Sequence, residues 1–177
     1  MPCCGAAKRQ QQFKAKDGTR VMILPAGKQS GRADAESRIE FYSPQNQFLC
    51  ALDYSSEDSE HGFGVVKAAW TRDNNYFVFS LTSSGGHQPW HSPTLFYTIG
   101  DNAIRSLDDY VQAPGISNGD FTLQYPNVVL TQALQGEKSV PVILHLDSMR
   151  AHKPQDVLRC AEGAVIKPES GEKKPNA

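Results

Sequence analysis

Short apolar runs separated by turn residues fill much of this chain, and this alternation constrains the fold more than any other feature. Asp17, Gln45, Asp73 and Asp101 occupy turn positions at intervals of 28 residues, and β-branched and aromatic residues flank the turns. That composition is typical of strands joined by tight connections. The spacing therefore predicts a meander of antiparallel hairpins, produced either by an internal duplication or by hairpins of similar length.

Local patterns predict where the elements lie. We expect strand pairs at 13–16 with 21–24, 39–42 with 48–52, 65–70 with 76–80, and 95–99 with 103–105, followed by strands at 121–125, 128–131 and 140–146. Pro141, near the start of the last strand, suits an edge strand or the entry to a strand. Ser106 with Asp109 three positions later predicts one helical turn. A second short helix is expected over residues 155–164.

Together these elements predict an all-β fold. We expect an antiparallel meander of hairpins forming a β-sandwich or a partial propeller-like sheet arrangement, with one or two short helices. The 177 residues fit one domain. A chain of this length can bury a core without the support of a metal or a disulfide. We expect that domain to cover residues 13–166, because residues 1–12 and 167–177 have the polar composition of disordered termini.

One hairpin resembles a known family. The run Trp70–Ser80, Trp-Thr-Arg-Asp-Asn-Asn-Tyr-Phe-Val-Phe-Ser, resembles the Trp-Ser-Pro-Asp-Gly turn and following apolar strand of TolB-type β-propeller blades, and Ser43–Asn46 is a fainter copy. The resemblance implies a blade-like hairpin at each place, and we expect Trp70 in the core. A propeller blade takes about 40 residues or more, so there is room for about four blades at most. This favours a sandwich or a partial sheet arrangement over a complete propeller.

The segment Gly85–Pro93, Gly-Gly-His-Gln-Pro-Trp-His-Ser-Pro, is the candidate functional loop. A hairpin usually needs two to five linking residues, whereas about twelve separate these two strands. An exposed Trp90 between His87 and His91 would offer a stacking surface for a sugar face or an apolar side chain; folded back, it would cover core. We expect a soluble, monomeric and non-catalytic binding module that contacts a glycan or protein here and needs no cofactor.

The alternative is a small hydrolase in which His87 or His91 acts as a general base or metal ligand. Their spacing would place two zinc ligands on one helical face, but Pro89 and the preceding glycines oppose a helix. Imidazoles bonded to the backbone of a proline-rich corner are the simpler interpretation, so no metal site is assigned. No Gly-x-Ser-x-Gly nucleophile motif occurs. A third alternative is self-assembly through an edge strand.

Charge and composition exclude several other classes. Eighteen Lys and Arg against nineteen Asp and Glu give a net charge of −1 with no basic stripe, so nucleic acid is not an expected partner. No apolar run approaches the roughly 18 residues that predict a transmembrane segment. Phosphate-loop and dinucleotide fingerprints are absent. The acidic stretch 57–61 lacks the pattern of a calcium loop and is expected to be solvated.

The four cysteines leave redox state and location open. A disulfide between Cys50 and Cys160 and a buried free thiol at Cys50 both fit the sequence. Cys3 and Cys4 fit a disordered terminus or a lipid-anchor site. We expect an exported domain, periplasmic or at the cell surface, if an export signal precedes Met1 in the native chain, and a cytoplasmic one otherwise.

Overall fold

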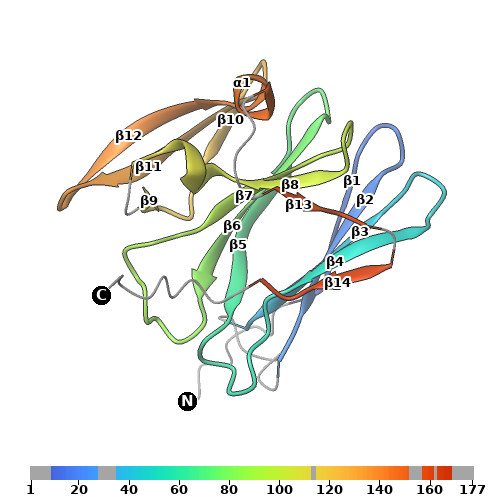
Figure 1. Ribbon diagram of the computed structural model, residues 1–177, viewed down its shortest axis with the longest axis horizontal. Coiled ribbons are helices and arrows are strands. Elements are labelled where there is room, and N and C mark those ends of the chain that lie inside the picture. The colour runs from blue at the N-terminus through green and yellow to red at the C-terminus, as the bar shows by residue number, and fades with distance from the viewer. Residues whose placement is uncertain (1–8, 28–34, 113–114, 152–156, 162, 169–177) are drawn as a thin grey trace, which may run out of the picture.

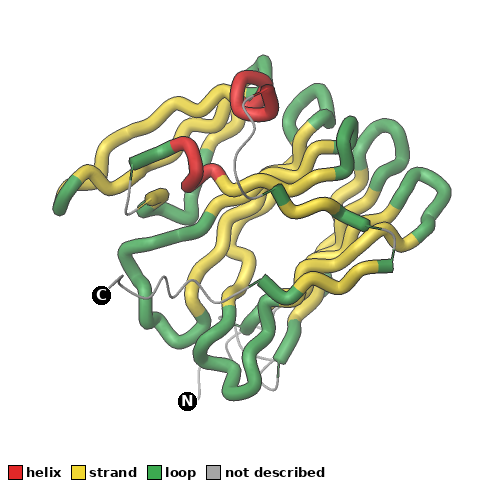
Figure 2. Tube along the Cα trace, viewed as in Figure 1, coloured by secondary structure: helices red, strands yellow, loops and turns green. Residues whose placement is uncertain are grey.

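Strands dominate the computed structural model, which describes residues 9–27, 35–112, 115–151, 157–161 and 163–168. Within this part the chain forms three β-sheets (Figure 1; Figure 2). We call them the N-terminal, central and C-terminal sheets. Every strand pairing is antiparallel except that of the last strand, which runs parallel to its neighbour. The all-β class expected from the sequence is confirmed.

The sheets are built mainly from strands that follow one another in the chain. The N-terminal sheet has the order β1 (Gln11–Lys14), β2 (Arg20–Pro25), β3 (Ser37–Tyr42), β4 (Phe48–Asp53) and β14 (Ala164–Ile166). The central sheet has the order β13 (Leu158–Arg159), β8 (Ala103–Ser106), β7 (Thr94–Thr98), β6 (Tyr76–Ser83) and β5 (Phe63–Trp70). The C-terminal sheet has the order β10 (Thr122–Gln124), β11 (Val128–Gln135) and β12 (Lys138–His145), and β9 (Gly115–Ile116) also pairs with β11. A 3-10 turn, η1 (Leu107–Tyr110), and a short helix, α1 (Leu146–Ala151), complete the described elements.

The central sheet is buried on both faces. Successive side chains of β6 alternate between them: Phe77 and Phe79 pack with the N-terminal sheet, whereas Tyr76 and Val78 pack with the C-terminal sheet. All four side chains are at most 1 % exposed. The first core is completed from the N-terminal sheet by Val21, Ile23, Ile39, Phe41, Cys50 and Leu52. The second is completed by Leu107, Ile116, Phe121, Val129, Leu144 and Leu146. The domain is therefore a sandwich with an additional third layer.

The first four hairpins share one turn geometry at the 28-residue interval. Gly18, Asn46, Asn74 and Asn102 have φ angles of 98°, 66°, 62° and 49°. In the first three hairpins, the N–H of this residue donates to the carbonyl three positions earlier, over 3.1, 2.9 and 2.9 Å. Glycine and asparagine adopt this left-handed conformation more easily than other residues. The spacing in the sequence thus corresponds to a repeated structural unit, two copies of which form most of each of the first two sheets.

The predicted helix over residues 155–164 is wrong. Leu158–Arg159 form β13 on the edge of the central sheet, and Ala164–Ile166 form β14 on the edge of the N-terminal sheet. Residues 155, 156 and 162 lie outside the described part. Gly163, with a φ of 76°, breaks any helix there, and pairing with two sheet edges overrides the local preference of so short a segment.

A disulfide joins Cys160, between these two strands, to Cys50 in β4. Cys50 is fully buried and Cys160 is 4 % exposed. Of the two alternatives that the sequence left open for Cys50, the cross-link is therefore the one found. Cys3 and Cys4 lie outside the described residues.

Several strand boundaries differ from the expected ones, and one prediction holds in detail. The strand expected over 140–146 runs from Lys138 to His145, and helix α1 begins at Leu146. Strand β1 includes Gln11 and Gln12, so order begins earlier than expected; residues 1–8 and 169–177 are outside the described part. The helical turn after Ser106 is present as η1, and the Ser106 hydroxyl accepts from the Asp108 N–H over 3.2 Å.

Among the described residues, no helix has the length and apolar character needed to span a membrane. Trp70 packs against the first core, as expected, with its ring centroid 5.1 Å from that of Phe77. Its indole nitrogen is buried and has no hydrogen-bond partner in the described part of the chain.

Because the central sheet is buried on both faces, removing a buried ring from either face should lower the free energy of unfolding by a similar amount. Phe79→Ala and Phe96→Ala, one in each core, should each lower the free energy of unfolding by about 3–5 kcal/mol, since both rings are fully buried. Ile143→Ala, at a side chain that is 65 % exposed, is the control and should cost under about 0.5 kcal/mol. Urea denaturation measures all three. A mild effect of Phe96→Ala alone would contradict the packing of the C-terminal sheet on the central sheet.

Candidate functional site

Two loops meet at one end of the central sheet and form the candidate site. The β4–β5 loop covers residues 54–62, and the β6–β7 loop covers residues 84–93. The Ser84 N–H donates to the Gly62 carbonyl over 3.0 Å, which fastens the start of the second loop to the end of the first. A side-chain carbon at Gly85 would collide with the Glu60 carbonyl. Glycine at this position therefore permits the close approach of the two loops.

A buried carboxylate holds these loops together. Glu36, just before β3, is 1 % exposed and accepts four hydrogen bonds from residues in the described part of the chain. They come from the Ser56 N–H at 2.7 Å, the Ser56 hydroxyl at 2.5 Å, the Gly62 N–H at 2.9 Å and the Ser84 hydroxyl at 2.9 Å. Such a set of donors compensates for removing a carboxylate from water. A side chain on Gly62 would collide with the Glu36 carboxylate, so glycine is required there.

Two imidazoles, one from each loop, stack at the surface. The ring centroids of His61 and His87 are 4.6 Å apart and the ring planes differ by 7°. His61 Nδ1 also lies 2.5 Å from Asp58 Oδ2. The pKa of Asp58 lies well below its usual range because the Glu60 N–H donates to it and the His61 ring adds a further hydrogen bond. The carboxylate is thus ionised at neutral pH and orients the stacked pair.

A polar hollow of about 510 Å³ lies beside His87, and we call it the serine pocket. Ser59, Glu60 and residues 82–87 line it. Its polar groups are the hydroxyls of three serines and Thr82, the Glu60 carboxylate and the His87 imidazole. Hydroxyl, carboxylate and imidazole groups are the kind that bond to the hydroxyls of a polar ligand.

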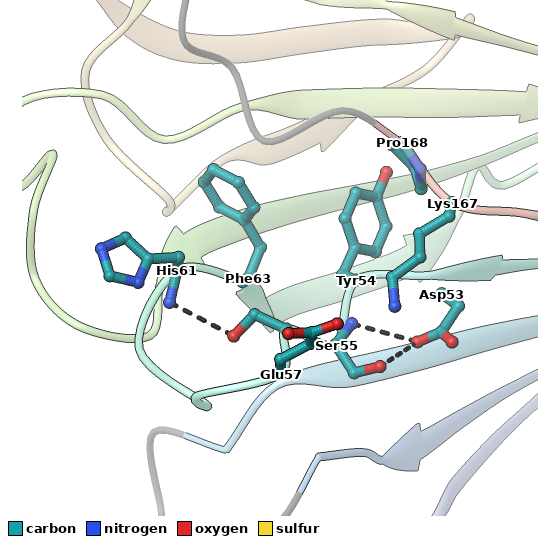
Figure 3. Close-up of a pocket in the computed structure, with 10 residues that line it drawn as sticks. Asp53, Tyr54, Ser55, Glu57, His61, Phe63, Lys167 and Pro168 are labelled. Carbon is teal, nitrogen blue, oxygen red and sulfur yellow. Dashed lines mark hydrogen bonds between the residues drawn. The ribbon is translucent and has the colours of Figure 1, made fainter.

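A second hollow, of about 360 Å³, is lined in part by the β4–β5 loop, and we call it the tyrosine pocket (Figure 3). Residues 53–57, 61–63 and 167–168 line it. Burial raises the pKa of the Tyr54 phenol. The pKa of Asp53 is lowered. Burial alone would raise this pKa, but the hydrogen bonds that Asp53 accepts from the Ser55 hydroxyl and N–H have a larger combined effect. Lys167 contributes to this lowering and supplies a cation to the pocket.

His91 has a different partner from His87 and fastens the far end of the loop. Its Nε2 lies 3.1 Å from Asp108 Oδ2, and the other oxygen of Asp108 accepts from the Ile116 N–H over 2.6 Å. The Ser92 N–H donates to the Ile116 carbonyl over 2.8 Å. The structure therefore does not bring the two histidines of the loop together. Among the described residues, no group of three or more His, Cys, Asp or Glu side chains is arranged to hold a metal ion.

Trp90 lies between these two anchored ends and is 54 % exposed. Of the two positions that the sequence left open, exposed or folded over the sheet edge, the exposed one is found. Neighbouring backbone is turned rather than extended, since the His91 N–H donates to the Gln88 carbonyl over 3.2 Å. Trp90 lines neither of the two pockets described above.

Sequence reasoning missed two residues on which the site depends. Glu36 is one of several alternating charged residues, with Asp34 before it and Arg38 and Glu40 after it, and nothing local marks it as buried. His61 was included in an acidic stretch expected to be a solvated loop, and the exposure of Asp58 and Glu60 agrees with that expectation. Its stacking on His87 depends on contact between two loops that are remote in sequence. The available signal was the Gly62 beside it, since a glycine in a loop often marks close backbone approach.

Comparisons of this chain with protein-family models, with curated proteins and with solved structures found no match.

The four hydrogen bonds to Glu36 predict that this residue orders both loops. Glu36→Ala should lower the free energy of unfolding by about 3 kcal/mol, because it leaves buried donors without an acceptor. Glu36→Gln should cost less, because its amide oxygen still accepts. Glu137→Ala, at an exposed turn, is the matched control and should change stability by under about 0.5 kcal/mol.

Urea denaturation measures these stabilities, and the NMR signals of the His61 and His87 rings report the stacking. Loss of the stacked arrangement in Glu36→Ala but not in Glu137→Ala is expected. A Glu36→Ala variant as stable as the parent would show that the loops are ordered by other contacts.

Proposed function

We propose that this domain is a non-catalytic binding module that contacts a glycan through the Gly85–Pro93 loop. The observation that carries the proposal is the half-exposed Trp90 indole on a loop whose two ends are fixed. Ser84 is bonded to the buried Glu36 at one end, and His91 is paired with Asp108 at the other. A large aromatic surface exposed to solvent on an ordered loop is a common recognition element.

The anchoring of the loop supports recognition on physical grounds. Binding by a mobile loop loses affinity to the ordering of backbone and side chains, and a pre-ordered loop avoids most of that cost. Indole rings stack on the apolar faces of sugars, while nearby polar groups bond to the hydroxyls. The serine pocket at the start of the same loop supplies hydroxyl, carboxylate and imidazole groups of this kind. This combination favours a glycan over an apolar protein surface.

The disulfide supports an exported location for this function. Disulfides form and persist in the periplasm, at cell surfaces and outside cells, and are rare where thiols are kept reduced. A buried cross-link between Cys50 and Cys160 fits an oxidising compartment. We infer that the domain acts in the periplasm or at the cell surface, where glycans are accessible.

A hydrolase is the second candidate, and the His91–Asp108 pair is the observation that favours it. A carboxylate on one ring nitrogen is how a catalytic imidazole is oriented. A general base also needs a nucleophile within hydrogen-bond reach. In the described part of the chain, no serine or cysteine side chain is hydrogen-bonded to the rings of His87 or His91. The pair is therefore better explained as an anchor of the loop.

The proposal predicts that Trp90 matters for binding and not for stability. On an array of immobilised oligosaccharides, Trp90→Ala should weaken binding by at least about 30-fold, the loss typical of a central aromatic contact. Its free energy of unfolding should change by under about 0.5 kcal/mol, since the ring is half exposed. Tyr125→Ala removes an aromatic ring that is 70 % exposed on another part of the surface, and it should leave binding unchanged.

Equal binding by the Trp90→Ala and Tyr125→Ala variants would overturn the proposal. Binding to a protein partner that depends on Trp90, with no glycan bound, would keep the loop as the binding site and replace the ligand class. Turnover of ester or glycoside substrates that is lost in His91→Ala would instead support the hydrolase.

A further inference from the structure

The C-terminal segment crosses from one sheet to another and closes the first core. We call it the strap and define it as residues 158–161 and 163–168. Its first part, β13, pairs with β8 on the edge of the central sheet, and β14 pairs with β4 on the edge of the N-terminal sheet (Figure 1). The strap thus connects the β8 edge of the central sheet to the β4 edge of the N-terminal sheet.

In the described part of the chain, few hydrogen bonds outside the two strand pairings hold the strap in this position. The Cys160 N–H donates to the Asn102 carbonyl over 3.0 Å, and the Asn102 amide donates back to the Cys160 carbonyl over 2.7 Å. The Gly163 N–H donates to the Leu49 carbonyl over 2.9 Å. Only two residues pair in β13 and three in β14. Strands this short contribute little stability alone.

Side-chain burial along the strap is partial. Cys160 is the one buried side chain among the described strap residues; Leu158 and Ile166 are half-buried and pack against the first core, and Val165 is 53 % exposed. Because apolar burial is the main source of stability, these two half-buried side chains hold the strap less firmly than the fully buried strands of the core are held. The Cys50–Cys160 bond is therefore its deepest anchor.

The position of the strap also decides whether the tyrosine pocket is complete. Lys167 and Pro168, which follow β14 directly, form one wall of that pocket (Figure 3). The opposite wall belongs to the β4–β5 loop, which Glu36 holds independently of the strap. Movement of the strap would remove the first wall and leave the second in place.

We propose that the Cys50–Cys160 disulfide is a redox-controlled lock on this strap. The oxidised protein keeps the strap closed and the tyrosine pocket complete; reduction releases the strap while the three-layered core stays folded. A dithiol reductant supplies the two electrons. One of its thiolates attacks one sulfur of the disulfide, which breaks the protein S–S bond, forms a mixed disulfide and releases the other cysteine as a thiolate. The second thiolate of the reductant then attacks the mixed disulfide and releases the remaining cysteine as a thiolate. The two protein thiolates take up the protons that the dithiol lost. The products are two protonated protein thiols and the oxidised reductant.

The burial of both sulfurs sets the order of events. Cys50 is fully buried and Cys160 is 4 % exposed, so a dithiol reaches the bond only after the strap opens locally. Local openings of this kind involve segments with few buried contacts. The lock therefore resists brief exposure to reductant, and once the bond is broken the strap has only its weak non-covalent contacts.

Hydrogen exchange of the full chain tests the lock. The C3A/C4A variant is used, so that Cys50 and Cys160 are the only thiols. In the oxidised protein, the Cys160 and Gly163 amides should exchange slowly. After reduction by a small dithiol, their exchange should accelerate by roughly 100-fold, the effect expected for a typical cross-link. The amides of Phe77, Val78 and Phe96 in the central sheet should change by less than about threefold, since the core remains folded.

A second variant distinguishes the contribution of the disulfide from that of the neighbouring hydrogen bonds. Asn102→Gly removes the side-chain hydrogen bond to the strap and the one accepted from Tyr97, tolerates the left-handed backbone of the turn and keeps the disulfide, so in the oxidised protein Gly163 exchange should rise by less than about tenfold. Unchanged exchange at Cys160 and Gly163 after complete reduction would overturn the proposal. Equal acceleration in the strap and in the central sheet would overturn it too, because the disulfide would then hold the whole fold.

Discussion

The burial of the central sheet on both faces is the constraint on which the rest of this structure depends. Strand β6 is apolar on either side, with Phe77 and Phe79 on one face and Tyr76 and Val78 on the other. A sheet with two apolar faces needs a cover on each. The N-terminal sheet covers one face by repeating the same hairpin geometry. The C-terminal sheet covers the other through a longer and less regular path, which includes η1 and α1.

This constraint explains how far the sequence could predict the fold. The four hairpins were found because their turns are local: Gly18, Asn46 and Asn74 adopt left-handed backbone that few other residues tolerate. The third layer was not foreseen, since a continuous apolar strand looks the same in a two-layered or a three-layered protein. Residues 155–164 were assigned a helix because pairing with two remote sheet edges leaves no mark on so short a segment.

The same distinction applies to the site. The loop could be recognised from its length and from its Gly, Pro, His and Trp content, because these are local properties. Its internal arrangement could not, since His87 stacks on His61 and His91 pairs with Asp108, and both partners lie outside the loop. Glu36 illustrates the limit most clearly. A buried acid is recognised by the donors that converge on it, and here those donors come from two loops that are both remote from Glu36 in the sequence.

The edges of the sheets bear on which surface can meet a partner. Exposed edge strands invite pairing with other chains unless something interrupts them. Strand β5 has a bulge at Val66, where its register with β6 shifts. In strand β12, Pro141 lies opposite Gln132 of β11. The Gln132 carbonyl accepts from the Ser117 N–H, so it points away from β12. Pro141 and Gln132 therefore do not bond to each other, and the proline nitrogen faces the open edge of the sheet. A proline there cannot donate to an added strand. Both long edges thus oppose assembly by strand addition, and the loop end around Trp90 becomes the better candidate for recognition.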